Sequence, residues 1–100
     1  MLQTLKNLFG PSVDLSEKIQ EGAIVIDVRT PGEFQSGHVK GSKNIPLNKV
    51  GQQVEKIKKW NKPVITCCAS GMRSGSAASI LKRQGIEAYN GGSWNSVDRL

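Results

Sequence analysis

Both cysteines of the chain lie side by side in one short segment, TCCASGMRSGSAAS at residues 66–79. Cys67 ends a run of apolar and β-branched residues, whereas Cys68 is followed by small residues and then by Arg73. A loop of small residues can curl so that several backbone N–H groups point at one centre, and the start of a following helix adds positive potential there. Such a nest favours the thiolate form of a cysteine at its mouth. The segment therefore predicts a thiolate beside an anion-binding loop.

The two thiols are expected to differ in role. Successive side chains of a strand point to opposite faces, so we expect Cys67, inside the strand, to be a buried and unreactive small side chain. Cys68, the first residue after the expected strand, is expected to be reactive. A buried structural role for Cys68 and a strained disulfide between the two remain alternatives. Adjacent cysteines lack the spacing of metal ligands, and His38 is the only histidine, so a metal site is not expected.

Strands are expected where short runs of β-branched and apolar residues occur. Such runs suit strands that are buried on both faces of a parallel sheet. The expected strands cover residues 23–27, 63–67 and 86–89. In an open parallel sheet, ligands bind beyond the carboxyl ends of the strands, where a loop leads into the next helix. The loop that follows residue 67 has such a position.

Helices are expected between these strands, from capping residues and apolar periodicity. The expected helices cover residues 14–22 with Asp14 as N-cap, 48–60 with Asn48 as N-cap, and 74–84 with Gly85 after the last turn. Residues 30–44 are expected to form a loop with one helical turn at 33–36, and residues 90–92 a turn. The alternation of strands and helices predicts an α/β domain with a mainly parallel sheet.

Length and composition restrict the class of protein. One hundred residues suit a single domain, and the net charge of +6 suits an anionic substrate, nucleic acid or an acidic protein partner. Five aromatic residues without a dense basic cluster argue against nucleic-acid binding. No run approaches the ~20 apolar residues of a membrane span, and residues 1–10 suggest one or two amphipathic turns rather than a signal peptide. A reducing cytoplasm, which keeps thiols free, is the expected compartment.

Three separated segments resemble the motifs of rhodanese-like domains. CASGMRS is similar to the active-site loop of that family, in which a cysteine opens a six-residue loop. DVRTPGEFQSGHVKGSKNIPL and NGGSW resemble two further motifs of the family, in the same order along the chain. The resemblance covers roughly residues 13–97. It implies a three-layer α/β/α fold with a small, mainly parallel central sheet, as one domain over residues 1–100.

The resemblance implies a sulfurtransferase that works without a metal or cofactor. Cys68 would carry a sulfane sulfur from thiosulfate or a persulfide donor to cyanide or a thiol. The implied partners are thus a small anionic donor and a thiophilic acceptor, with an acceptor protein as a further candidate, and neither nucleic acid nor a membrane. Arg73 would face the negative charge of the donor and Met72 the entrance. The substrate-binding loop would consist of Ala69, Ser70, Gly71, Met72, Arg73 and Ser74.

Two alternatives stay open. Counted from Cys67, the segment has the C-x5-R-S spacing of related phosphatases and arsenate reductases, although Thr66 stands where many such phosphatases have histidine. A phosphatase also needs a general acid, and no acidic residue can be assigned to that role from the sequence. The other alternative is a binding or regulatory module without catalysis.

Residues outside the cysteine loop are expected to have structural roles. Asp27 and Arg29, at the end of a strand, are expected to tie loops together. His38, in a turn-rich segment, is expected to make a structural hydrogen bond. Trp60 and Trp94 are expected to cover the core. Only six residues follow Trp94, so one flank of the site is expected to be open.

Overall fold

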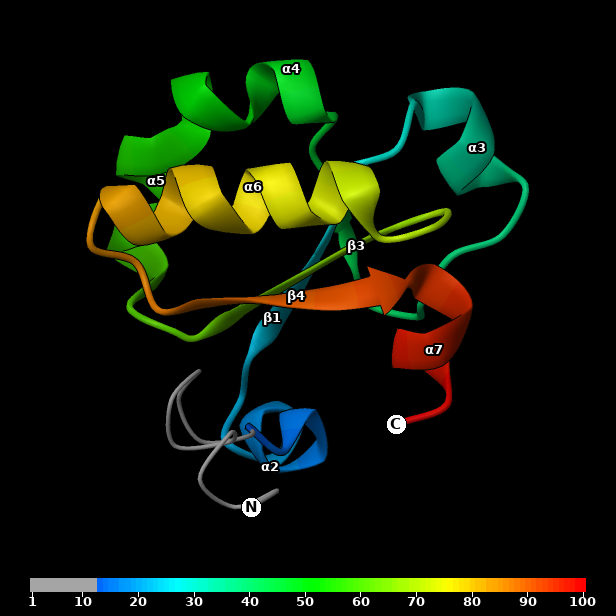
Figure 1. Ribbon diagram of the computed structural model, residues 1–100, viewed down its shortest axis with the longest axis horizontal. Coiled ribbons are helices and arrows are strands. Elements are labelled where there is room, and N and C mark those ends of the chain that lie inside the picture. The colour runs from blue at the N-terminus through cyan, green and yellow to red at the C-terminus, as the bar shows by residue number, and fades with distance from the viewer. Residues whose placement is uncertain (1–12) are drawn as a thin grey trace, which may run out of the picture.

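Four strands form one sheet in the computed structural model, which describes residues 13–100 (Figure 1). The strands are β1 (Ile24–Asp27), β2 (Lys43–Asn44), β3 (Val64–Cys68) and β4 (Ala88–Ser93). They lie in the order β2-β1-β3-β4, and each neighbouring pair runs parallel. The expected parallel sheet is therefore confirmed in this part of the chain. The amphipathic turns expected within residues 1–10 lie outside the described residues.

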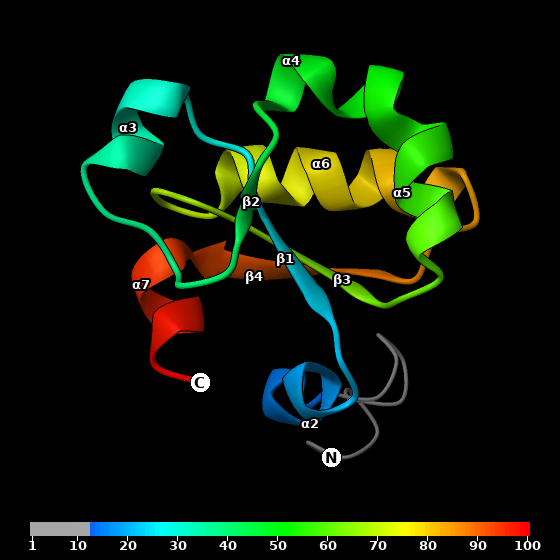
Figure 2. The same ribbon diagram turned by 180° about the vertical axis from the view of Figure 1, so that it is seen from behind.

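The helices cover both faces of this sheet. They are α2 (Leu15–Gln20), α3 (Pro31–Gln35), α4 (Leu47–Val50), the 3-10 helix η1 (Gly51–Gln53), α5 (Val54–Trp60), α6 (Met72–Arg83) and α7 (Trp94–Asp98). Figures 1 and 2 show α4, α5 and α6 on one face and α2 and α7 on the other. The three-layer α/β/α arrangement is thus confirmed.

Each face of the sheet has its own hydrophobic cluster. On one face, Ile26 and Val64 of the sheet pack with Ile57 of α5 and Leu81 of α6. On the other face, Ile65 and other sheet residues pack with the residues of α2 and α7 that point inward. Since the central strands are covered on both sides, their sequences consist of continuous apolar runs rather than alternating ones.

The boundaries around the cysteine loop differ from those expected. The strand β3 does not stop at Cys67: it includes Cys68, which pairs with Ser93 of β4 across an irregularity in the register. The helix α6 begins at Met72, two residues earlier than expected, after Gly71 with a φ of 104°. The connecting loop is therefore shorter than the motif, because pairing with β4 extends one end and the helix absorbs the other.

Other elements also differ from the expectation. Residues 90–92 belong to β4 rather than to a turn. The expected helix at 48–60 starts after Pro46 instead of Asn48 and is interrupted by η1 at Gly51. The helical turn in the long loop covers residues 31–35, where Thr30 and Glu33 form a capping box. The strand β2 and the helix α7 had no counterpart in the prediction, because each is short and depends on neighbours that are distant in sequence.

A clear test of the core packing is the replacement Gly91→Ala. A Cβ atom at Gly91 would lie 2.6 Å from Val97 Cγ2, 2.8 Å from Ile65 Cγ2 and 2.9 Å from the carbonyl oxygen of Thr66. We expect the free energy of unfolding to fall by about 3 kcal/mol, because overpacking of a rigid core forces the backbone to shift. Urea denaturation measures this change. The control Gly32→Ala, with no heavy atom within 4 Å, should change stability little, and an equal loss in both variants would contradict the packing argument.

Candidate active site

The sulfur of Cys68 lies at the carboxyl end of β3, where backbone N–H groups converge on it. Gly71 N–H donates to Sγ at 3.0 Å and Ser74 N–H at 3.4 Å. The positive φ of Gly71 bends the loop back toward the strand. Cys68 is fully buried, although Ala69 and Ser70, which follow it, are exposed. This loop can therefore hold a negative charge on sulfur without a metal ion.

The pKa of the Cys68 thiol reflects two opposing effects. Burial by itself raises this pKa, because a charged sulfur loses its contact with water. Hydrogen bonds that involve the Ser74 side chain and the N–H groups of Ser74, Gly71 and Ser70 outweigh the burial and lower the pKa below its usual range. The structure thus favours the thiolate at Cys68.

The neighbouring Cys67 has the opposite environment. It is fully buried in the cluster that contains Ile65 and Val97, on the other face of the sheet. Burial, together with the nearby carboxylate of Asp27, raises the pKa of the Cys67 thiol to about 12. At neutral pH this thiol is protonated, as a buried structural cysteine is expected to be.

A short chain of hydrogen bonds links Cys68 to β4. The Cys68 thiol contacts Ser74 Oγ at 3.4 Å, and the Ser74 hydroxyl donates to Asn90 Oδ1 at 2.6 Å. The amide of Asn90 also accepts from Gly92 N–H at 2.9 Å and donates to the Gly71 carbonyl at 3.1 Å. Asn90 therefore holds in place both Ser74 and Gly71, the last residue of the loop before α6. Its position before the Gly-Gly pair was the only sequence signal for it.

Arg73 lies in the first turn of α6 and is bound by α3. Its two terminal nitrogens donate to the Glu33 carboxylate at 2.8 and 3.0 Å. Both side chains are 37% exposed. The hydrogen bonds from Arg73, followed by those from Thr30, lower the pKa of Glu33 to about 2. The pair ties the helix that carries Arg73 to the long loop after β1, and sequence alone did not connect the two residues.

The remaining residues of the expected loop are brought to the same place. Met72 is 82% exposed at the start of α6, beside Arg73, whereas Ser74 is fully buried. Ala69, Ser70 and Gly71 form the short connection between β3 and α6. Within residues 13–100, no three His, Cys, Asp or Glu side chains lie close enough to bind a metal ion. No helix in the same residues has the length and apolarity to cross a membrane.

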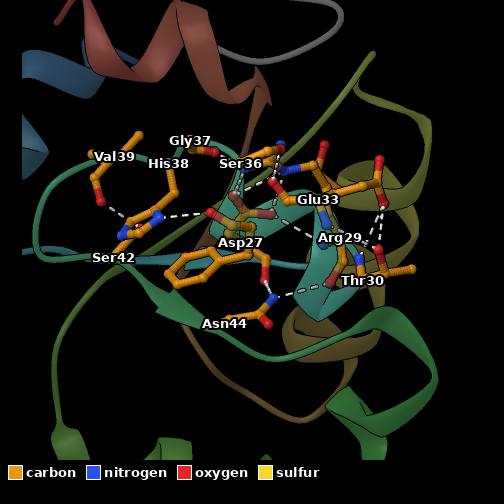
Figure 3. A network of polar contacts seen from close by, with 12 residues as sticks. Asp27, Arg29, Thr30, Glu33, Ser36, Gly37, His38, Val39, Ser42 and Asn44 are labelled. Carbon is orange, nitrogen blue, oxygen red and sulfur yellow. Dashed lines mark hydrogen bonds and ion pairs between the residues drawn. The ribbon is translucent and has the colours of Figure 1, made fainter.

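Asp27 and Arg29 form a buried ion pair at the carboxyl end of β1 (Figure 3). The Asp27 carboxylate accepts from Arg29 Nε at 2.9 Å and from a terminal nitrogen at 2.7 Å. The same nitrogen donates to the Gly37 carbonyl at 2.7 Å, and Asn44 Nδ2 donates to the carbonyl oxygens of Asp27 and Arg29. This network fixes the long loop against β1 and β2, which is the tying role expected for the pair.

Three aromatic or heteroaromatic side chains have the structural roles expected of them. His38 Nδ1 contacts the Phe34 carbonyl at 2.7 Å, and the two rings are stacked with their centres 3.7 Å apart. Trp60 and Trp94 are partly buried, and each packs against one of the two hydrophobic clusters. Within residues 13–100, none of these three side chains forms a hydrogen bond with the Cys68 sulfur.

The hydroxyl of Ser74 can be tested by the replacement Ser74→Ala. This hydroxyl donates to Asn90 Oδ1 beside the thiol, and it can turn its proton toward the Cys68 thiolate. Loss of the hydroxyl should raise the pKa of Cys68, because hydrogen bonds to the charged form favour it. A hydrogen bond to a charged group contributes about 1.5–3 kcal/mol, so alkylation by iodoacetamide at pH 7 should slow about tenfold. The pH dependence of the alkylation rate measures the shift. Ser79→Ala, exposed on the same helix, is the control, and an unchanged profile for Ser74→Ala would contradict the role of its hydroxyl.

Comparison with known proteins gives consistent matches. A model of the family described as "Rhodanese-like domain" matches residues 12–96. The chain is 45% identical over 69 residues to YqhL of Bacillus subtilis, covering 68% of this chain and 54% of the relative. It is 34% identical over 68 residues to the thiosulfate sulfurtransferase GlpE of Pseudoalteromonas translucida, covering 68% and 64%. The matches thus span about half to two thirds of the length of these curated relatives.

Solved structures show the same fold. A rhodanese with anions from E. coli superposes with a TM-score of 0.67 at 34% identity, covering 74% of this chain and 89% of the other. A rhodanese-related protein from Thermoplasma volcanium superposes with a TM-score of 0.68 at 32% identity, covering 86% of each chain. The overall fold is therefore shared with these solved structures.

Proposed function

Because this chain belongs to the rhodanese-like domain family, we propose that it transfers sulfane sulfur and carries that sulfur on Cys68. Family membership and relatives named thiosulfate sulfurtransferase support the class of activity. The observation that carries the assignment to Cys68 is the convergence of the Gly71 and Ser74 N–H groups on its sulfur. Such groups, fixed before the reaction, stabilise negative charge where it develops.

The first half of the proposed reaction loads the enzyme. The Cys68 thiolate attacks the outer sulfur of thiosulfate and forms a new S–S bond. The S–S bond of thiosulfate breaks, and its electron pair leaves with sulfite. The product is a persulfide on Cys68 whose terminal sulfur bears the negative charge. The N–H groups of the loop and the positive end of α6 would hold this anion.

The second half returns the enzyme to its starting state. Cyanide or a thiolate attacks the terminal sulfur, and the electron pair of the S–S bond returns to Cys68. The products are thiocyanate, or a persulfide on the acceptor, and the Cys68 thiolate. A low pKa helps this step because it makes Cys68 a good leaving group. Since free thiols persist in a reducing compartment, we propose that the reaction takes place in the cytoplasm.

Arg73 is proposed to attract the anionic donor. Its guanidinium lies in the first turn of α6, two residues after Gly71, and Glu33 binds two of its nitrogens. This pair fixes the direction of the Arg73 side chain while leaving that side chain more than a third exposed. An anion that approaches the loop would meet Arg73 before it meets the buried sulfur.

Use of Cys67 in phosphatase chemistry has less support. Its pKa is about 12, and the loop N–H groups that the structure describes point at Cys68 instead. A phosphatase of this type needs a thiolate nucleophile at the centre of the oxyanion loop. The geometry therefore favours a sulfur carrier on Cys68 over a phosphate-binding Cys67.

Mass spectrometry of the intact protein tests the proposal. After incubation with thiosulfate and removal of excess donor, one added sulfur atom per chain is expected. Addition of cyanide should remove that sulfur and produce an equal amount of thiocyanate. A chain that takes up no sulfur would overturn the proposal in favour of a binding module, and turnover of an aryl phosphate would favour the phosphatase.

A further inference from the structure

A groove rich in lysine lies along the edge of the sheet, between β2 and the helical segment from α4 to α5. It has a volume of about 420 Å³, and Lys43, Pro46, Lys49, Lys56 and Trp60 contribute to its walls. We propose that this lysine groove binds an extended acidic segment of a protein that accepts sulfur from Cys68. The inference rests on the proposed function, because it names the class of acceptor that the same site would serve.

The sequence explains how one wall of the lysine groove arises. Lys49, Gln53, Lys56 and Trp60 follow one another at intervals of four, three and four residues. This spacing places them on one face of a helical segment, and all four line the groove. Lys43 of β2 forms the opposite wall, with its Nζ 5.4 Å from the centre of the Trp60 ring. Figure 2 shows β2 in front of the other strands and leading into α4.

The charge of the lysine groove is not neutralised by the protein itself. No acidic residue lines it. In the part of the chain that the structure describes, Lys43, Lys49 and Lys56 form no ion pair with a carboxylate, whereas Lys18 and Lys58 do. Three like charges around one groove repel each other, and an anionic partner removes that repulsion. The chemistry of the walls therefore selects a partner with several negative charges.

The lysine groove leads to the proposed active site. Pro46 lines both the groove and an adjacent hollow of about 360 Å³, whose wall includes Thr30, Leu47 and Arg73. Arg73 belongs to the loop motif that surrounds Cys68. A molecule in the groove can therefore continue past Pro46 toward Arg73, and a thiol at its end would approach the persulfide.

The dimensions favour an extended peptide over a small anion. The helical wall from Lys49 to Trp60 covers twelve residues, and its eleven steps of 1.5 Å give a length of about 16 Å for a straight helix. An extended peptide rises about 3.3 Å per residue, so about five residues fill this length. The other wall is β2, the edge strand of the described sheet, and edge strands commonly receive extended segments. Thiosulfate and cyanide are far too small to contact all three lysines.

The transfer step would follow the chemistry already proposed. A cysteine thiolate at the end of the acidic segment attacks the terminal sulfur of the Cys68 persulfide. The S–S bond to Cys68 breaks, its electron pair returns to Cys68, and the partner cysteine leaves as a persulfide. The lysine groove would contribute by holding the acceptor thiol close to the sulfur, which lowers KM and leaves the reaction with cyanide unaffected.

Binding is tested without any sulfur chemistry. The probe is a fluorescein-labelled peptide of four Glu or Asp residues and one Ser. A neutral peptide, with Gln at the acidic positions, is the comparison. Fluorescence anisotropy should show at least tenfold tighter binding of the acidic peptide. This preference should weaken as salt rises from about 50 to 300 mM. It should disappear in Lys49→Glu/Lys56→Glu and persist in Lys82→Glu/Arg83→Glu, which has the same charge change at the far end of α6.

Sulfur transfer is then measured with the Ser of each peptide replaced by Cys, placed at either end. The acidic peptide should accept sulfur from the loaded enzyme with at least tenfold higher kcat/KM than the neutral peptide. Lys49→Glu/Lys56→Glu should abolish this advantage while transfer to cyanide stays within about twofold. Absence of any sulfur on Cys68 would refute the proposed function alone, because the binding experiment reports on the groove independently.

Three results would overturn the inference. The first is equal binding of the acidic and neutral peptides. The second is an equal loss in the groove variant and the α6 control, which would reduce the effect to net charge. The third is tighter binding of inorganic triphosphate or a short single-stranded oligonucleotide than of the acidic peptide, with the same dependence on Lys49 and Lys56. That result would assign the groove to a phosphorylated ligand instead.

Discussion

Replacing Cys68 by alanine should lower the rate of sulfur transfer from thiosulfate to cyanide by about a thousandfold or more, because the nucleophile itself is lost. The matched variant Cys67→Ala should keep the rate within about threefold. It should lose only about 1 kcal/mol of stability, since a small buried side chain leaves a small cavity. Thiocyanate formation and the mass of the intact protein measure the two effects.

The contrast between the two variants follows from their surroundings. Both thiols are fully buried, so burial alone raises the pKa of each. Only Cys68 receives hydrogen bonds from Gly71 and Ser74 that reverse this effect. Cys67 has apolar neighbours and the Asp27 carboxylate near it, which oppose a negative charge. Neighbouring positions on one strand thus hold one thiol that favours the charged form and one that opposes it.

The opposite pattern would refute the assignment. Activity that survives Cys68→Ala and disappears with Cys67→Ala would identify Cys67 as the nucleophile. Loss of activity in both variants with retained folding would indicate that the pair acts together. Circular dichroism of each variant separates these outcomes from simple unfolding.

The layered fold could be predicted because its signals are local. Continuous β-branched runs marked β1 and β3, and the N-cap at Asp14 is confirmed by its hydrogen bond of 2.9 Å from Ser16 N–H. Helix α6 was expected from its apolar face and from Gly85. Each of these signals depends on residues within a few positions of the element itself.

The end of β3 could not be predicted in this way. The sequence-based choice of Cys68 used a strand boundary after Cys67, and that boundary is wrong, because Cys68 pairs with Ser93. This pairing across an irregular register depends on Ser93, which lies 25 residues further along the chain. The two thiols differ because successive side chains of one strand point to opposite faces of the sheet. This alternation could be predicted from the sequence, and it places Cys67 and Cys68 in different hydrophobic clusters. The choice of Cys68 as nucleophile stays a prediction for the variants to test.

The partners of the loop were also beyond sequence reasoning. Glu33 and Arg73 are 40 residues apart, and Asn90 is 16 residues from Ser74. No periodicity or capping rule connects such positions; only the sheet order β2-β1-β3-β4 brings them to one edge. The loop motif predicted the place of the chemistry, whereas the side chains that hold the loop came from the packing of distant segments.

The buried ion pair between Asp27 and Arg29 should contribute strongly to the free energy of unfolding. Asp27→Asn should lower the free energy of unfolding by about 3–5 kcal/mol, because it leaves a buried charge on Arg29 without a partner. Arg29 is only 4% exposed and Asp27 is fully buried, so water cannot replace the lost carboxylate. The control Glu55→Gln breaks a pair whose glutamate is 84% exposed, and it should cost less than about 0.5 kcal/mol. Urea denaturation measures both.

A second replacement separates a charge effect from a packing effect. A loss of this size could unfold a domain whose total stability is about 5–15 kcal/mol, so the double variant Asp27→Asn/Arg29→Leu is the decisive comparison. Removal of both charges also removes the buried cation, and exchange of a buried pair for uncharged groups is often nearly neutral. We therefore expect the double variant to be more stable than Asp27→Asn alone, even though it gives up the hydrogen bond from Arg29 to the Gly37 carbonyl. A double variant that is less stable than the single one would show that the Arg29 contacts, rather than its charge, hold the loop in place.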